Sequence, residues 1–266
     1  MGNSAVYLEM IRIRFLMMLA YRTNYYSGIL IYSINIGAYY FLWQAIYGAQ
    51  ESIQGMDAAQ MTTYVAVAWM ARAFYFNNID REIAQEIQEG KVAVEMIRPY
   101  HYLGVKTMQG LGEGLFRLLF FSLPGMVVIW LAFPITFSDN FAVWGFFFIS
   151  ILFSFIVNTQ INLLTGMATF FLLYNTGLIR GKRVVIDLFS GLLLPISFYP
   201  LWAQEIMQFL PFQAISYIPS MIFTEAFTGT EIYQALGIQL FWAAVLIIPI
   251  QLMWVLAKRQ LIVQGG

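Results

Sequence analysis

Long apolar runs constrain this chain more than any other feature of its sequence. Hydrophobic residues make up 60% of the chain and charged residues only 11%, whereas soluble domains carry about 25% charged residues. Because about 20 apolar residues suffice for a helix to cross a bilayer, we expect an all-α polytopic membrane protein with a single transmembrane domain over residues 1–266. The predicted spans are Tyr26–Tyr47, Gln60–Phe76, Leu111–Phe133, Phe141–Tyr174, Val184–Phe198 and Ala235–Ala257.

The fourth and fifth predicted spans depart from an ordinary crossing. Residues 141–174 would form about 51 Å of helix against about 30 Å of hydrocarbon. This segment must therefore tilt, break or continue into the cytoplasm. The fifth span is short and ends at the helix-breaking sequence PISFYP.

The distribution of basic residues predicts the orientation of the spans. The connections after the first, third and fifth spans contain no Lys or Arg, and all but two of the 14 basic residues lie on the opposite side. The remaining two, Arg72 and Arg117, sit near span ends that face this opposite side. Because cytoplasmic loops collect Lys and Arg, we expect six spans with both termini in the cytoplasm.

A further helix is expected before the first span, at residues 5–21. Tyr7, Ile11 and Phe15 recur at helical spacing, and arginines interrupt the apolar run. This pattern predicts an amphipathic helix in the membrane interface, with its arginines toward lipid headgroups. The alternative is a cytoplasmic extension of the first span.

The segment IDREIAQEIQEGKVAVEMIRPY, residues 79–100, concentrates charge that the rest of the chain avoids. Its isoleucines repeat every four residues, Asp80 is placed to cap the start of a helix, and Gly90 to end it. A short amphipathic helix with an acidic bias suits docking into a groove on a soluble partner. The alternative is a helix on the membrane surface, although such helices are usually basic because the inner leaflet is anionic.

Two patterns then connect the chain to a known family. After the second span, an isoleucine and a glycine precede an apolar strip ending in Arg-Pro, here Ile87, Gly90, Ile97, Arg98 and Pro99. Around the end of the fifth span, the corresponding pattern is Gly191, Pro195, Tyr199, Pro200, Leu210, Pro211, Phe212 and Pro219. Over essentially its whole length the chain resembles the membrane subunit of an ABC-2 type ABC transporter, and most of all the bacterial permeases that pair with a separate ATPase.

The resemblance implies a permease, most often an exporter, in the bacterial cytoplasmic membrane. Its expected partners are a cytoplasmic ABC ATPase dimer, a second permease subunit and membrane lipids. ATP and Mg would bind to the ATPase, and no cofactor is expected on this chain. The resemblance also places a coupling helix, which sits in a cleft of the ATPase, at residues 79–91. Its expected contact residues are Asp80, Arg81, Ile83, Glu86, Ile87, Glu89, Gly90 and Lys91.

By the same resemblance, residues 200–231 would form re-entrant extracellular helices before the last span. The sequences LWAQEIMQFL and AISYIPSMIFTEAF are apolar but too short to cross, and prolines punctuate them. The alternative is an outer interfacial hairpin anchored by aromatic residues.

Strongly polar groups inside the spans are few. The amides of the fourth span either line a substrate path or hydrogen-bond neighbouring helices. The candidates for a path or gate are Asn158, Gln160, Asn162, Pro195, Pro200, Pro211 and Phe212. Glu113 and Arg117, four residues apart, are expected to form a structural ion pair, with a relay role as the alternative.

Several function classes lack the residues they need. One histidine and no cysteine leave no recognisable metal site and no histidine-assisted nucleophile. The sequence G-x-x-x-x-G-K-[ST] of a phosphate-binding loop is missing, and we expect no nucleic-acid partner. The alternative function is an ion-gradient-driven secondary transporter or channel subunit, which would need mid-membrane acids and usually an inverted repeat. A purely structural membrane scaffold is a third reading.

Overall fold

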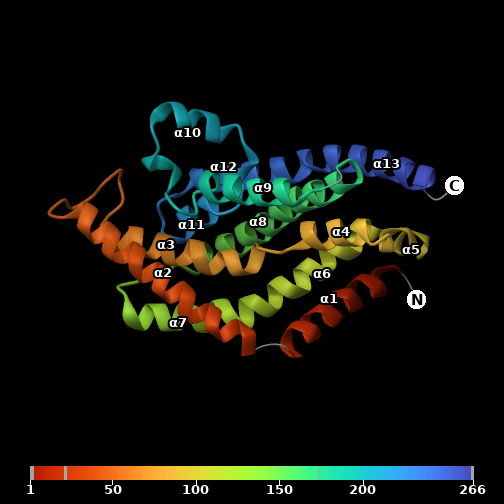
Figure 1. Ribbon diagram of the computed structural model, residues 1–266. Helices are drawn as coiled ribbons and strands as arrows, with labels where there is room; N and C mark the ends of the chain where they lie inside the picture. Colours follow the sequence, from red (N-terminus) through yellow and green to blue (C-terminus); the bar gives the residue numbers. More distant parts are fainter. Residues whose placement is uncertain (1–2, 21–22, 173, 265–266) are drawn as a thin grey trace.

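The computed structural model describes residues 3–20, 23–172 and 174–264, and these residues fold into helices joined by short connections (Figure 1). The helices are α1 (Asn3–Ala20), α2 (Thr23–Tyr47), α3 (Ala58–Tyr75), α4 (Ile79–Gln88), α5 (Lys91–Ile97), α6 (Tyr102–Arg117), η1 (Leu118–Ser122), α7 (Leu123–Ala132), α8 (Phe141–Met167), η2 (Ala168–Phe170), α9 (Thr176–Phe189), η3 (Ile196–Phe198), α10 (Leu201–Gln208), η4 (Pro211–Ala214), α11 (Tyr217–Phe223), α12 (Thr230–Val245) and α13 (Ile247–Gln264).

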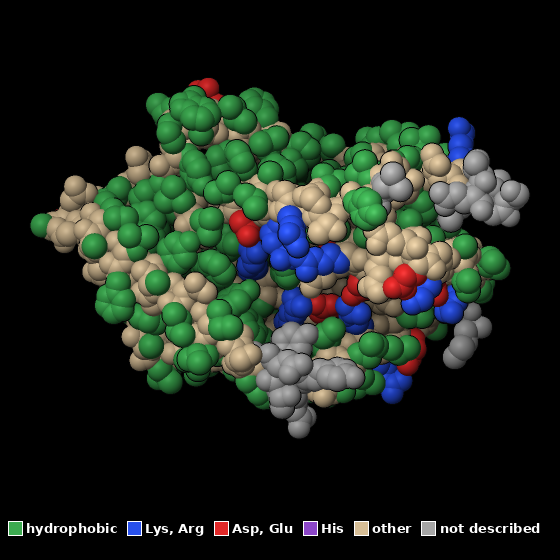
Figure 2. All heavy atoms as spheres, in the orientation of Figure 1, with side chains coloured by type: hydrophobic (Ala, Val, Ile, Leu, Met, Phe, Trp, Pro, Cys, Tyr) green, Lys and Arg blue, Asp and Glu red, His purple; other side chains and the backbone are tan. Residues whose placement is uncertain are grey.

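The long helices share one direction, so the molecule has two distinct ends. Figure 1 places α4, α5, the start of α1 and the end of α13 at one end, and the connection between α2 and α3 at the other. Lys and Arg side chains gather over the middle of the molecule and the end that holds α4 and α5, whereas the opposite end of this face shows none (Figure 2). Both chain ends therefore lie on the basic side.

Among the residues that the structure describes, four helical stretches are long and apolar enough to cross a membrane: Tyr26–Tyr47, Tyr102–Ala132, Phe141–Phe170 and Thr230–Gln260. They coincide with the first, third, fourth and sixth predicted spans. The fourth is unbroken through α8 and ends in the short turn η2. Thirty residues of helix extend about 45 Å, more than the hydrocarbon thickness, so this helix tilts or continues beyond it. The chain is an integral membrane protein.

The other two predicted spans differ from these four. Helix α3 is 18 residues long and buried along most of its length, with Thr62, Thr63 and Arg72 in its sequence. A helix surrounded by other helices needs fewer apolar residues than one facing lipid, which explains its lower hydropathy. Helix α9 has 14 residues and is about 21 Å long, which is shorter than the four candidate spans. Helix α3 therefore falls short of these spans in hydropathy, and α9 falls short of them in length.

The prediction of one helix over Val184–Phe198 is wrong. Helix α9 begins eight residues earlier and ends at Phe189, and the chain then turns at Gly191, whose φ is +81°. The Gly191 carbonyl accepts a 2.6 Å hydrogen bond from the Tyr64 hydroxyl of α3. The turn is buried and held by neighbouring helices, which is how non-helical backbone is accommodated at membrane depth.

The third span contains a local irregularity at η1, a π-helical turn between α6 and α7. Pro124 follows it directly, and a proline has no N–H to donate to the preceding turn and clashes with the carbonyl four residues earlier. A π-turn relieves that clash without ending the helix. At its other end the helix begins at Tyr102, nine residues before the predicted start, because polar residues extend it past the apolar run.

Helix α1 lies along α6, as Figure 1 shows. The Phe15 and Phe116 rings meet edge to face with centroids 5.9 Å apart, and a Cβ on Gly112 would lie 2.3 Å from the Ile11 carbonyl oxygen. A helix is thus observed where one is expected at 5–21, packed against the bundle, and its location in the membrane interface stays a prediction. Tyr21 and Arg22 lie outside the described residues.

Candidate functional site

The charged segment after α3 forms two short helices, α4 and α5, separated by Gly90. Gly90 has a φ of +71°, the left-handed conformation expected for a helix-ending glycine. Asn78 occupies the position before α4, and Asp80 lies inside the first turn. The prediction that Asp80 caps the helix is therefore wrong, because its carboxylate is engaged elsewhere.

The isoleucine face of α4 packs inward against α8. Ile83 is fully buried and Ile79 nearly so, while Ile87 is half-buried. The close approach depends on Gly166 of α8, where an added Cβ would lie 2.9 Å from the Ile83 Cβ. This face therefore fixes α4 to the bundle, and Ile83 is not available on the surface of the chain.

The acidic residues of α4 face basic residues of the same chain. Glu82 forms an ion pair with Arg14 of α1, and Glu86 pairs with Lys106 of α6. Glu86 also accepts a 2.6 Å hydrogen bond from the Tyr102 hydroxyl. Two different helices are thereby tied to α4.

A third tie joins α4 to α9. The Lys182 ammonium lies 2.6 Å from the Asp80 carboxylate and also donates to the Asn162 side-chain oxygen on α8. The Asp80 side chain is 2% exposed and that of Lys182 is 13% exposed. Three helices, α1, α6 and α9, thus each supply a cation to one acid of α4.

The predicted Glu113–Arg117 ion pair is present in α6, and it has a third member. The Arg14 guanidinium contacts the same carboxylate, at 2.7 Å, and so bridges Glu113 of α6 and Glu82 of α4. Arg117 further donates to the Phe76 carbonyl oxygen at 3.0 Å. The pair thus belongs to a network that joins α1, α4 and α6.

The surface that α4 and α5 leave exposed is not acidic. Glu89 and Lys91 are exposed and paired with each other, and their contact lowers the pKa of Glu89 and raises the pKa of Lys91. The apolar side chains of Val94 and Ile97 are 60% and 85% exposed. A groove between α4 and the start of α9 is lined by Arg81, Ala84, Gln85, Gln88, Asn175, Thr176, Ile179 and Arg180.

The expectation that an acidic helix face awaits a partner is therefore wrong. Asp80, Glu82 and Glu86, which are all the acids within α4, face cations of the same chain. The charge is concentrated here because it holds α4 in place. A partner would meet the basic and amide side chains of the groove together with the apolar tip of α5.

The amides of α8 hold the end of α3. Asn158 donates to the Tyr75 carbonyl oxygen at 2.8 Å, and Asn162 donates to the Asn77 side-chain oxygen at 2.8 Å. Asn77 in turn donates to the Thr159 hydroxyl. Gln160 donates to the Ala243 carbonyl oxygen of α12 at 2.7 Å. All three predicted amides of α8 thus hydrogen-bond neighbouring segments, which is one of the two interpretations given for them.

Sequence reasoning missed that this patch belongs to a longer stripe. Ser150 and Ser154 precede Asn158 at the same four-residue spacing and are fully buried. Ser150 donates to Gln239 of α12, and Ser154 donates to the Ala214 carbonyl oxygen of η4. The spacing S-x-x-x-S-x-x-x-N-x-x-x-N was the available signal. One face of α8 thus connects the η4 region to the end of α3 and to α4.

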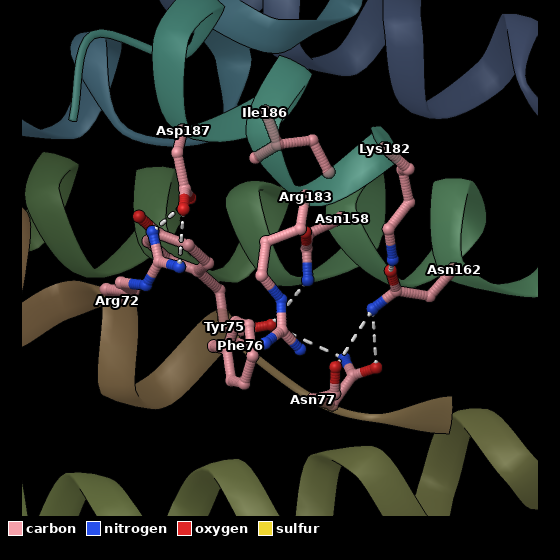
Figure 3. Close-up of a pocket in the computed structure, with 10 residues that line it drawn as sticks. All are labelled: Arg72, Tyr75, Phe76, Asn77, Asn158, Asn162, Lys182, Arg183, Ile186 and Asp187. Atoms are coloured by element: carbon pink, nitrogen blue, oxygen red, sulfur yellow. Dashed lines mark hydrogen bonds and ion pairs between the residues drawn. The ribbon is translucent and has the colours of Figure 1, made fainter. Parts of the chain in front are cut away.

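A pocket opens where α3, α8 and α9 meet (Figure 3). It is lined by Arg72, Tyr75, Phe76, Asn77, Asn158, Asn162, Lys182, Arg183, Ile186 and Asp187. Arg72 donates to both oxygens of Asp187, so the ion pair spans the gap from α3 to α9. Asn158 and Asn162 thus line a pocket as well as bonding to α3.

The remaining predicted path residues occupy the segment that follows α9. Pro195 is buried, Pro200 is exposed, and Pro211 is half-buried at the start of η4. The Phe212 ring lies 6.3 Å from the Phe189 ring at the end of α9. None of these four lines the polar pocket. Their role in a path or gate stays a prediction.

Comparison with known proteins identifies the family. A search of the curated proteins gave no match. The sequence profile described as ABC-2 family transporter protein matches residues 33–265, from within α2 to the end of α13. This match covers well over half of the chain and includes α4, α5 and the pocket. The chain therefore belongs to the ABC-2 transporter family and is a membrane permease of an ABC transporter.

Proposed function

We propose that the chain is one permease subunit of an ATP-driven exporter, with a cytoplasmic ATPase dimer and a second permease subunit as its partners. The observation that carries this proposal is the attachment of α4. It packs on α8 through Ile83 and is tied by ion pairs to three further helices. A force applied to α4 therefore reaches four helices of the bundle.

The surface for the ATPase would be the outer side of α4 and α5. Arg81, Gln85 and Gln88 are exposed along α4, and Ile97 projects at the end of α5. Large exposed apolar side chains at the tip of a polar segment are typical of protein interfaces. ATP and Mg bound by the ATPase would supply the energy, and this chain would convert closure of the ATPase into a shift of α4. In this proposal, residues 79–91 would contact the ATPase through the exposed side of α4 and the start of α5.

The orientation follows from the basic side of the molecule. The start of α1, the end of α13 and α4–α5 share one end, and the positive-inside bias supports a cytoplasmic location for that end. We propose six crossings in the bacterial cytoplasmic membrane, with α3 and α9 as the two beyond the four long apolar stretches. Residues 200–231 would then form re-entrant elements at the outer end.

A second permease subunit would lie against α9. Val184, Val185 and Leu188 are exposed on this helix beside the pocket. The pocket is lined by residues of α3, α8 and α9 and lies beside this exposed face. Two such subunits facing each other would enclose a path between them.

Site-directed labelling tests the orientation without background, because the chain has no cysteine. Gln85→Cys on α4 and Ser52→Cys at the opposite end are both exposed positions. We expect a membrane-impermeant maleimide to label Ser52→Cys in intact cells and Gln85→Cys only after permeabilisation. Labelling of Gln85→Cys from outside would overturn the proposal.

Co-purification tests the partner. A cytoplasmic ABC ATPase should co-purify with the wild type, and Val94→Asp combined with Ile97→Asp should reduce its recovery. The double substitution Leu201→Asp with Trp202→Asp, at exposed positions of α10 away from α4 and α5, is the matched control for the ATPase contact. Equal ATPase recovery from the wild type and the α5 variant would contradict the proposed surface.

A further inference from the structure

We propose that the pocket between α3 and α9 binds a phosphate group carried by an amphipathic molecule, with Arg183 as its principal contact. The binding site itself is a property of this chain. Its place on the transport path rests on the proposed function above.

The charges around the pocket do not balance. Arg72 is paired with Asp187 and Lys182 with Asp80. Arg183 has no carboxylate partner among the residues that the structure describes, and its polar contact is the neutral side-chain oxygen of Asn78, at 3.3 Å. One positive charge is thus left over in a partly enclosed site.

The position of Arg183 suits an incoming anion. Figure 3 shows its side chain reaching from α9 into the space between Asn158 and Asn77. Its guanidinium carbon lies 4.9 Å from the centre of the Phe76 ring, which holds the group in place from one side. A guanidinium presents a planar fork of donors that matches the oxygens of a phosphate.

The neutral groups of the pocket are already engaged. Asn158 donates to the Tyr75 carbonyl oxygen, and Asn162 donates to Asn77. These amides therefore shape the pocket and leave Arg183 as the donor that is free to bind.

The surroundings favour a ligand with an apolar part. Val184 directly follows Arg183 and is 58% exposed, and Leu188 is 43% exposed one turn further along α9. A molecule whose phosphate lies at Arg183 could therefore place its hydrocarbon along this side of the helix. A lipid headgroup and a free phosphate share the same contact chemistry, and the experiment separates them.

The test uses the full-length chain purified in a zwitterionic detergent and titrated with lipid under native mass spectrometry. Phosphatidylglycerol and a diacylglycerol with identical acyl chains, which lacks the phosphate, are the two probes. We expect the wild type to prefer the anionic lipid by about tenfold in Kd, as one charge-assisted bidentate contact provides. Arg183→Gln should reduce this preference to near unity, and Arg183→Lys should leave part of it.

Arg180→Gln is the matched control, because it removes the same charge from the same helix outside the pocket. It should keep the wild-type preference. Competition by inorganic phosphate at millimolar concentration would show that a free phosphate also occupies the site, and lack of competition would restrict the site to lipid-borne phosphate. Both results support the anion site.

An unchanged lipid preference in Arg183→Gln, or an equal loss in Arg180→Gln, would overturn the proposal. Thermal unfolding of each variant reports whether the fold is retained, and Arg183→Lys keeps the test informative if the glutamine variant is unstable. Recovery of the ATPase with the same variants separates the two proposals. Lipid selectivity that depends on Arg183 in a chain that recovers no ATPase would leave the anion site standing and reject the exporter assignment.

Discussion

Lys182 and Asp80, 102 positions apart in the sequence, meet with their charged atoms 2.6 Å apart and join α9 to the first turn of α4. Both side chains are largely buried. Burial makes the pair costly to break, because the remaining charge has no partner and little water. The contact makes the position of α9 depend on the position of α4.

A double-mutant cycle measures this dependence. Lys182→Met alone should destabilise the chain by roughly 3 kcal/mol, because it leaves the Asp80 carboxylate buried and unpaired. Lys182→Met combined with Asp80→Asn should recover much of that loss, since no buried charge remains. Denaturant or thermal unfolding in detergent gives the loss of stability of Lys182→Met, of Asp80→Asn and of the double variant. Losses that simply add would show that the two residues do not interact.

The exposed pair that flanks Gly90, between α4 and α5, is the control for this cycle. Glu89 and Lys91 are also in contact, yet both side chains reach solvent. Solvent screens such pairs, so Lys91→Met should leave the unfolding transition unchanged. A loss as large as that of Lys182→Met would mean that burial does not determine the effect.

Gly166 sets how closely α4 can approach α8. A Cβ at this position would lie 2.9 Å from the Ile83 Cβ and 3.1 Å from the Asp80 Cα, and a backbone atom cannot move aside as a side chain can. Gly166→Ala should therefore shift α4 and cost about 1–3 kcal/mol, as overpacking does. Faster hydrogen exchange of the α4 amides would report the shift.

Gly145→Ala provides the comparison on the same helix. No atom lies within 4 Å of its added Cβ, so the substitution should be neutral or slightly stabilising through helix propensity. Similar effects at both glycines would show that the contact with α4 is not the cause.

The sequence-based prediction succeeded where the signal is local. Apolar length located four spans, and the glycine at position 90 ended a helix as its freedom at positive φ suggests. The spacing of Glu113 and Arg117 predicted a pair because both lie on one helix. Such features need no knowledge of which helices are neighbours.

The partners of the acids of α4 could not be predicted in this way. Arg14, Lys106 and Lys182 come from three separate helices, and periodicity reveals which face of a helix is polar without revealing what covers it. The acids were therefore assigned to an absent partner. The break at Gly191 was misplaced for a related reason, because the contacts of Tyr64 and Tyr217 that hold it come from distant segments.

The turn at Gly191 gives a further prediction. Its φ of +81° disfavours any other residue, and an added Cβ would lie 2.7 Å from the Tyr217 Cβ. Gly191→Ala should therefore destabilise the chain by more than the roughly 1 kcal/mol expected from a left-handed conformation alone. Gly90→Ala, in the left-handed conformation at a φ of +71° with no atom within 4 Å of its added Cβ, measures that conformational part. Equal melting temperatures for the two variants would contradict the packing argument.

We expect the stability of the folded chain to depend on pH through His101, the single histidine of the chain. Its Nδ1 accepts the Gly104 N–H at the start of α6, which requires an unprotonated nitrogen. Burial, with a smaller contribution from the positive charge of Lys258, lowers the pKa of His101 below its ordinary value of 6.5. The folded state therefore binds this proton more weakly than the unfolded state.

The direction of the effect follows from that difference. Above pH 6.5 the imidazole is neutral in both states and costs nothing. As the pH falls below this value, the unfolded chain takes up the proton first, so stability decreases on acidification. Melting temperatures between pH 7.5 and 5.5 should fall more steeply for the wild type than for His101→Asn, which keeps a capping acceptor without titrating. A steeper fall in the asparagine variant would reverse the sign and reject this role for His101.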